Sequence, residues 1–213
     1  MKQSNLYSKL LKSPDNAPVF ISEKLELNFI LQAYKLGLFP WTSNPVTWWC
    51  PSPRMVLFPA DIHIQKSIKK SLKTYDIKLD KNFNSLINLC ASREKTWISQ
   101  EFIVIYNELF KQNIAHSVEV YENNKLIGGL YGLIIGKMFF GESMISLKKD
   151  ISKIALIKLC EILSPFEFII DCQIPNNHLK FMGAKELSKK DFLEILEKKI
   201  NLQSGFENFR NLL

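Results

Sequence analysis

The sequence predicts an α+β protein in which helices dominate the first half and strands dominate the second. Apolar residues recur at helical spacing in several segments before residue 112. From His116 onward, β-rich runs alternate with turn residues and give a βββαβα order. A hydrophobic fraction of 46% and a charged fraction of 23% over 213 residues are typical of a globular chain. We therefore expect two lobes that are joined near residue 113.

Helices are expected wherever apolar residues fall on one face. The first covers residues 22–37, with an apolar stripe that includes Tyr34 and a stop at Gly37. Further helices are expected over 61–74, 83–91, 100–112, 150–164 and 188–199. Residues 38–58 hold three of the four tryptophans among several prolines, which indicates an ordered connection of loops and strands.

Strands are expected mainly after residue 115. Residues 116–142 read as a hairpin that turns at Asn123-Asn124, followed by a second turn at Gly136-Lys137. The pair Gly128-Gly129 inside this segment predicts a bulge. A short apolar strand follows at 166–174. The expected organisation is an N-terminal segment with its Trp/Pro-rich connection at 1–50, the rest of the N-terminal lobe at 51–112, and a C-terminal lobe at 113–213.

The charge of the chain points to an acidic partner. The formal net charge is +7, and Lys66, Lys69, Lys70 and Lys73 recur at i, i+3, i+4 and i+7, which is one face of a helix. Lysines neutralise phosphates, and exposed tryptophans stack on unpaired bases. Trp41 and Trp97 lie in loop-like contexts, so a single-stranded RNA end is the expected ligand. The alternatives are a solubilising lysine surface and tryptophans that pack in the core.

Three polar residues end two of the expected strands. Glu142 lies within the run "MFFGESMI", where a buried carboxylate needs a partner, a shifted pKa or a function. Asp171 and Gln173 share one face of the strand "FEFIIDCQI", with Cys172 on the other. If the strands are neighbours, Glu142, Asp171 and Gln173 converge in one cleft. The alternative is that Asp171 caps a turn and Gln173 is solvated.

Several other chemistries find little support. The four cysteines are scattered without a C-x-x-C pair, and the three histidines lack metal-ligand spacing, so no metal site is expected. A nucleophilic pair of Cys172 with His178 has no evident third group to orient it. Glycine-rich phosphate loops are absent from the sequence. No signal peptide and no run long enough to span a bilayer are found, so a soluble cytoplasmic protein is expected.

The motifs "LQAYKLGLFPW", "WWCPSPRMVLFP", "TWIS", "FFGESM" and "IDCQ" resemble the bacterial leucyl/phenylalanyl-tRNA–protein transferase family, collinearly from about Leu31 to Leu196. The resemblance implies an N-terminal tRNA-contacting lobe and a C-terminal catalytic lobe similar to the GNAT acyltransferase fold. It also implies transfer of Leu, Phe or Met from aminoacyl-tRNA to proteins with N-terminal Arg or Lys, which marks them for degradation. No cofactor is implied, no membrane partner, and the chain is expected to be a monomer.

The resemblance assigns roles to particular residues. Glu142, Asp171 and Gln173 match the polar catalytic centre. From their chemistry we expect Asp171 to act through Gln173, orienting the amine and relaying its proton, and Glu142 to bind the positive charge of the acceptor. Trp41 and Trp97 match the positions that hold the terminal adenosine. The lysines at 66, 69, 70 and 73 form the basic helix that is expected to bind the acceptor stem. The pocket for the aminoacyl side chain is expected to consist of Leu130, Phe139, Met144, Leu156, Leu159 and Ile170.

The chain departs from the family pattern at Leu147, where the family usually carries an arginine, with Lys148 as the neighbouring substitute. The segment "PVFISEKLEL" lacks the paired glycines usual in the family. Two alternatives stay open: an inactive RNA-binding module, and an acyl-CoA N-acyltransferase of the GNAT type. The second would need a glycine-containing pyrophosphate cradle at the helix after Glu142, and "SLKKDISK" contains no glycine.

Overall fold

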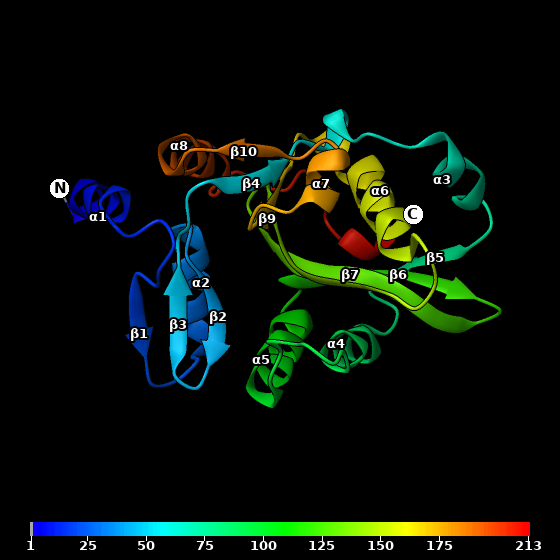
Figure 1. Cartoon of the computed structure of the whole chain (residues 1–213), viewed down its shortest axis with the longest axis horizontal. Helices are drawn as coiled ribbons and strands as arrows, with labels where there is room; N and C mark the ends of the chain where they lie inside the picture. Colours follow the sequence, from blue (N-terminus) through cyan, green and yellow to red (C-terminus); the bar gives the residue numbers. More distant parts are fainter. Residues whose placement is uncertain (1) are drawn as a thin grey trace.

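The computed structural model describes residues 2–213, and the side chains of residues 7–213. Within this range the strands form two sheets (Figure 1). The smaller sheet has the order β1-β3-β2 and is built from Phe20–Ser22, Phe39–Ser43 and Val46–Trp49. Helices α1 (Lys2–Leu11) and α2 (Leu27–Lys35) accompany it. The Trp/Pro-rich connection is therefore mostly antiparallel sheet.

The larger sheet has the order β10-β4-β9-β8-β7-β6-β5. Its strands, in chain order, are β4 (Arg54–Leu57), β5 (Asp76–Leu79), β6 (Ala115–Glu122), β7 (Lys125–Ile135), β8 (Met138–Ser146), β9 (Ile169–Gln173) and β10 (Lys185–Leu187). Neighbouring strands are antiparallel except β8 and β9, which are parallel. Because β4 and β5 precede residue 113, the lobe boundary expected there does not coincide with an edge of this sheet.

Helices cover both faces of the larger sheet (Figure 1). Helices α4 (Phe83–Ala91) and α5 (Gln100–Lys111) pack on one face, and α6 (Ile151–Leu163) packs on the other. Each face carries its own apolar core: Phe102 and Phe140 belong to the first, and Phe139 and Leu156 to the second. Short helices α3 (Lys66–Ser71) and α7 (Asn177–Phe181), helix α8 (Lys189–Lys199) and the 3-10 turns Pro59–Asp61, Ser164–Phe166 and Phe209–Asn211 complete the chain.

Most expected elements are confirmed, with two large differences in length. The helix expected over 22–37 covers only Leu27–Lys35, because Phe20–Ser22 forms strand β1 and Glu26 is extended. Helix α4 has the expected bounds, and the β6–β7 turn falls at Asn123 and Asn124, both in the left-handed region. The register of β6 on β7 shifts next to Gly128, as the expected bulge requires. The helix expected over 61–74 is only six residues long, because Asp61 belongs to a separate 3-10 turn and the backbone is extended at Ile62 and Gln65. The α+β class is confirmed, whereas the likeness to the GNAT fold stays a prediction.

No helix within residues 2–213 is long and apolar enough to cross a membrane.

Candidate active site

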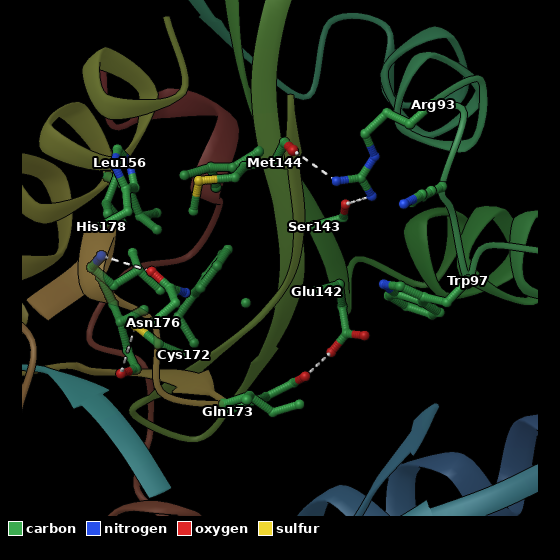
Figure 2. A pocket seen from close by; sticks show the side chains of 18 residues that line it. Arg93, Trp97, Glu142, Ser143, Met144, Leu156, Cys172, Gln173, Asn176 and His178 are labelled. Atoms are coloured by element: carbon green, nitrogen blue, oxygen red, sulfur yellow. Dashed lines mark hydrogen bonds between the residues drawn. The ribbon is translucent and has the colours of Figure 1, made fainter. Parts of the chain in front are cut away.

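A cavity of about 320 Å³ opens between β8, β9, α6, α7 and the segment that precedes α5 (Figure 2). The parallel pairing of β8 with β9 ends at Phe140 and Asp171, although β8 continues to Ser146. The carboxyl end of β9 is therefore not paired with the second half of β8, and the cavity lies between these two unpaired segments. Its lining is Arg93, Lys95, Trp97, Leu130, Phe139, Gly141, Glu142, Ser143, Met144, Leu156, Leu159, Ile170, Cys172, Gln173, Ile174, Asn176, His178 and Leu179.

A β-bulge directs Glu142 into this cavity. Tyr131 of β7 pairs with Ser143, and the next residue, Gly132, pairs with Gly141, so Glu142 is the extra residue on β8. A Cβ atom on Gly132 would lie 2.2 Å from the carbonyl oxygen of Phe140, so the close approach of the strands here requires glycine. Bulges interrupt the alternation of a strand and reorient a side chain. This local geometry explains how a carboxylate fits into an otherwise apolar strand.

The carboxylate of Glu142 is held by three donors. Its Oε1 accepts hydrogen bonds from the Tyr34 hydroxyl at 2.6 Å and the Gln173 Nε2 at 3.0 Å. Its Oε2 accepts one from the Tyr106 hydroxyl at 2.7 Å. The residue is 8% exposed, and burial raises the pKa of Glu142 to about 7, while the two tyrosine hydrogen bonds oppose that rise. The group therefore exchanges a proton in the neutral range.

Sequence reasoning missed Tyr34 and Tyr106, the two hydroxyl donors of Glu142. Both are fully buried, on α2 and α5, and their hydroxyls lie 2.8 Å apart. Tyr34 belongs to the apolar stripe of its helix, so the pattern identified it only as a core residue. A tyrosine in such a stripe places its hydroxyl wherever the tertiary packing directs it, which no local spacing encodes.

Asp171 lies behind the cavity and not in its wall. The carboxylate is fully buried and forms a bidentate ion pair with Arg54, with Nε–Oδ1 at 2.8 Å and Nη2–Oδ2 at 2.6 Å. The Arg54 guanidinium lies between the rings of Phe39 and Phe192, with centroid distances of 4.7 and 4.5 Å. The pair joins β4 to β9 and fastens both to the smaller sheet and to α8.

Gln173 connects Asp171 to Glu142. Its backbone N–H donates to Asp171 Oδ1 at 2.9 Å, and its side-chain amide donates to Glu142. Gln173 has a φ of 63°, which is the left-handed region, and Cys172 is the extra residue where β9 pairs with β4. This break in alternation places Gln173 in the cavity wall together with Cys172, although period-two alternation assigns them to opposite faces. Asp171 therefore contacts the main chain of Gln173, and the Gln173 side chain turns to Glu142.

The apolar part of the cavity contains every residue expected in the aminoacyl pocket. The six residues are Leu130, Phe139, Met144, Leu156, Leu159 and Ile170, which come from β7, β8, α6 and β9. All except Met144 are buried. Their role as a side-chain pocket stays a prediction, but their convergence on one cavity is a property of the structure.

The two tryptophans expected at the adenosine site differ in position. Trp97 is half-buried, lines the cavity and packs edge-on against Phe102 with a centroid distance of 4.9 Å. Trp41 is half-buried on β2, where it packs edge-on against Trp49 at 4.8 Å, and it does not line the cavity. The structure thus brings Trp97, but not Trp41, into the wall around Glu142.

The four lysines expected to bind the acceptor stem are exposed. Lys66, Lys69 and Lys70 lie on α3, and Lys73 follows its end. Ile68 is buried in the core beside α6 and holds the helix on the protein. The lysine face is thus free to contact a ligand, away from the cavity wall.

The position at which the chain departs from the family pattern is also exposed. Leu147 is 57% exposed, and Lys148 forms an ion pair with Glu122 at 2.5 Å.

A nucleophilic role for Cys172 finds no support. Burial raises the pKa of its thiol well above the ordinary value, which keeps the sulfur protonated. Its sulfur lies 3.9 Å from the carbonyl oxygen of Ile170, and no hydrogen bond joins it to His178 within residues 7–213. Both residues line the cavity, so their contribution is to its shape and polarity.

The fold and the cavity define a class of protein. It is an α+β protein in which a buried glutamate with a pKa of about 7 faces an apolar cavity, and aromatic and cationic side chains form the rim of that cavity. Residues 56–197 match the family model of leucyl/phenylalanyl-tRNA protein transferase, and residues 23–52 match the N-terminal domain of that family. The two matches are separated by residues 53–55, at the start of β4. The chain belongs to the leucyl/phenylalanyl-tRNA–protein transferase family and is an aminoacyltransferase by that membership.

Several relatives carry the name of the same family. The leucyl/phenylalanyl-tRNA–protein transferase of Campylobacter lari is 78% identical over 213 residues, and that of Campylobacter jejuni subsp. jejuni serotype O:2 is 61% identical over 214, each covering 100% of both chains. The Legionella pneumophila (strain Corby) protein is 44% identical over 176 residues and covers 79% of each chain. A conserved Staphylococcus epidermidis protein of unknown function matches 79% of this chain and 66% of its own at 12% identity and a TM-score of 0.38, which supports no inference.

Proposed function

We propose that this chain transfers Leu, Phe or Met from aminoacyl-tRNA to the α-amino group of proteins that begin with Arg or Lys. One observation carries the proposal: the Glu142 carboxylate, with a pKa of about 7, lies at the junction of the apolar cavity and its polar rim. The chain acts as a monomer in the cytoplasm, where charged tRNA and nascent N-termini meet. The product carries a new apolar N-terminal residue that marks it for degradation.

The apolar part of the cavity selects the donor. An unbranched or γ-branched apolar side chain gains by leaving water for a wall of leucine, isoleucine, phenylalanine and methionine, whereas a polar side chain loses hydration without a new partner. The ester carbonyl of the donor then lies toward Glu142 and Gln173. Because the ester is already activated, correct placement of the amine against this carbonyl supplies most of the rate.

Glu142 handles the proton of the acceptor amine. The amine nitrogen must lose a proton before it attacks the carbonyl carbon, and an α-ammonium group ordinarily has a pKa near 8. A carboxylate with a pKa of about 7 lies roughly one unit below it, whereas an unshifted glutamate lies more than three units below. Proton transfer to Glu142 is therefore nearly balanced. The free amine attacks, the C–N bond forms and the C–O bond to the ribose breaks. Glu142 returns the first proton to the departing ribose oxygen, and the new amide nitrogen releases its second proton to solvent.

Asp171 acts as a positioning residue. Its ion pair with Arg54 fixes the carboxylate, and the carboxylate fixes the Gln173 main chain in its left-handed conformation. The Gln173 amide is thereby directed to Glu142. The sequence predicts instead that Asp171 relays the amine proton through Gln173 and that Glu142 binds the positive charge of the acceptor. In the mechanism proposed here Glu142 takes the proton, and Asp171 positions Gln173 through its main chain.

The lysine face of α3 and the Trp97 ring bind the donor's RNA. The exposed ammonium groups of α3 match a phosphate backbone, and this contact weakens as salt rises. Trp97 offers its ring at the cavity, where an unpaired terminal base stacks. Trp41 joins this base site only if the RNA reaches the smaller sheet.

The test is transfer of labelled leucine from Leu-tRNA to a peptide that begins with Arg, beside the same peptide beginning with Ala. Transfer to the Arg peptide alone supports both the reaction and the cationic acceptor. Binding of tRNA without transfer to either peptide would favour an inactive RNA-binding module. Acylation that depends on acyl-CoA instead of tRNA would overturn the proposed donor.

A further inference from the structure

Two cations lie at the rim of the cavity, on the segment that joins α4 to α5. Arg93 and Lys95 line the cavity from this segment, which also carries Trp97. Figure 2 shows the Arg93 side chain extending to β8 above Glu142, with Trp97 on the same side. Neither cation belongs to the lysine face of α3, and the transfer chemistry uses neither. Their placement beside the carboxylate and the ring calls for a ligand.

The Arg93 guanidinium is fixed in place. Its Nε donates to the carbonyl oxygen of Cys90 at 2.9 Å, and its Nη2 donates to the Ser143 hydroxyl at 2.8 Å. Its Nη1 lies 3.5 Å from the carbonyl oxygen of Met144. These contacts use three of the five N–H groups of a guanidinium and leave one on each terminal nitrogen. A preorganised fork with two free donors matches the oxygens of a phosphate.

None of the side chains that the structure describes neutralises the positive charge of this rim. Within residues 7–213, no carboxylate lies within ion-pair distance of Arg93 or Lys95. Lys95 is exposed and forms no hydrogen bond in the same range, so its ammonium is free to move toward a ligand. Other arginines of the chain are paired: Arg54 with Asp171, and Arg210 with Asp80. An unneutralised pair of cations beside a substrate cavity indicates an anionic part of the substrate.

We propose that Arg93 and Lys95 bind the phosphodiester that joins the terminal adenosine of the donor to the preceding nucleotide. The inference rests on the proposed function. The ester at the 3′ side of the ribose lies toward Glu142, and the base stacks on Trp97. The 5′ oxygen then carries the nearest anion, and Ser143, the residue next to Glu142, already holds the guanidinium on that side. The site therefore sets the position of the ribose, and with it the ester carbonyl.

The experiment compares two minimal donors: 3′-O-leucyl-adenosine and the same compound with a methyl phosphodiester on its 5′ oxygen. Transfer to an Arg peptide is measured with the wild-type chain, Arg93→Gln and Lys95→Gln. We expect the phosphodiester to raise kcat/KM of the wild type by about tenfold or more, as suits hydrogen bonds to a charged group. In each variant the phosphodiester raises kcat/KM much less than in the wild type, because the KM for the phosphodiester donor increases.

A matched control removes one positive charge elsewhere. Lys198→Gln, on the exposed side of α8 and outside the cavity wall, keeps the full advantage of the phosphodiester. Arg93→Lys keeps the charge but loses the fork, so its ratio falls between those of the wild type and Arg93→Gln. If Arg93→Gln fails to fold, Lys95→Gln decides, because its side chain supports no other residue.

Two results overturn the proposal: a wild-type chain that does not distinguish the two donors, or an advantage that survives in both glutamine variants. Adenosine and adenosine 5′-methylphosphate, tested as competitive inhibitors of transfer from Leu-tRNA, give the same comparison when the minimal donors react slowly. Failure of the proposed function gives a different result, because Leu-tRNA itself then yields no product with the wild-type chain.

Discussion

Two buried glutamates in the larger sheet have similar surroundings and different accessibility. Glu119 on β6 is fully buried and accepts hydrogen bonds from the Asn82 backbone, the Ser117 hydroxyl and the Tyr121 hydroxyl, the last at 2.5 Å. Glu142 on β8 also has two hydroxyl donors and one nitrogen donor. Hydrogen bonding and burial alone therefore do not separate a catalytic carboxylate from a structural one.

The difference lies in what each carboxylate faces. The partners of Glu119 come from its own strand and from the start of α4, where Asn82 is the N-cap, so Glu119 fastens that helix to the sheet. The partners of Glu142 come from α2, α5 and β9, and the residue lines a cavity. A carboxylate that organises three distant elements around an open space is the one available to a substrate.

The largest expected effect separates the two carboxylates by activity. Glu142→Gln keeps the shape of the side chain and removes the proton acceptor, so leucine transfer should fall by about 10²- to 10⁴-fold. Initial rates of transfer to the Arg peptide measure this. Glu119→Gln is the matched control and should keep its rate per folded molecule. Full activity of Glu142→Gln would refute its role in handling the proton.

Glu119→Gln, which should keep its activity, is expected to lose stability. Glu119→Gln replaces an acceptor of four hydrogen-bond contacts with an amide that brings its own donors, and it should lower the free energy of unfolding by about 2–3 kcal/mol. Urea denaturation at pH 7 measures the loss. An unchanged midpoint would mean that α4 is fastened without Glu119.

The pH dependence of stability should also distinguish Glu142. Its pKa rises from 4.5 to about 7 on folding, so between these values the folded chain binds more protons than the unfolded chain. The contribution of Glu142 to stability is then fully present below pH 4.5 and is lost as pH rises through 7, by about 3 kcal/mol at most. The difference in Tm between Glu142→Gln and the wild type should therefore become more positive from pH 5 to pH 8. A difference that does not vary with pH would contradict the raised pKa.

The smallest expected effect concerns the tyrosines. Tyr106→Phe removes a hydrogen bond that lowers the pKa of Glu142, so the acid limb of the rate profile should move to higher pH and the rate at pH 7 should fall about tenfold. Tyr121→Phe removes the corresponding hydroxyl from Glu119 and should leave the profile in place. An identical profile for Tyr106→Phe would show that Tyr34 and Gln173 suffice.

Local sequence signals predicted the elements and much of the cavity. The spacing of apolar residues placed α4 and α5, and Asn123-Asn124 fixed the β6–β7 turn, because these signals act over one or two turns of chain. The six residues of the apolar pocket were identified through motifs shared with a family, and all of them line one cavity. The apolar run around Glu142 predicted a buried carboxylate. Burying an unpaired carboxylate costs free energy, so a partner or a function was expected for it.

Only the tertiary structure decided what surrounds that carboxylate. The bulge at Glu142 depends on the pairing of β7 with β8, and the partners Tyr34 and Tyr106 lie 108 and 36 residues away in the sequence. The ion pair of Arg54 with Asp171 joins residues 117 apart in the sequence, and it holds the Asp171 side chain behind the cavity wall. Composition, pattern and motif thus determined which residues are apolar, charged or costly to bury. Which of them meet was decided by packing between distant segments, because hydrogen-bond partners are chosen by position in space and not by spacing along the chain.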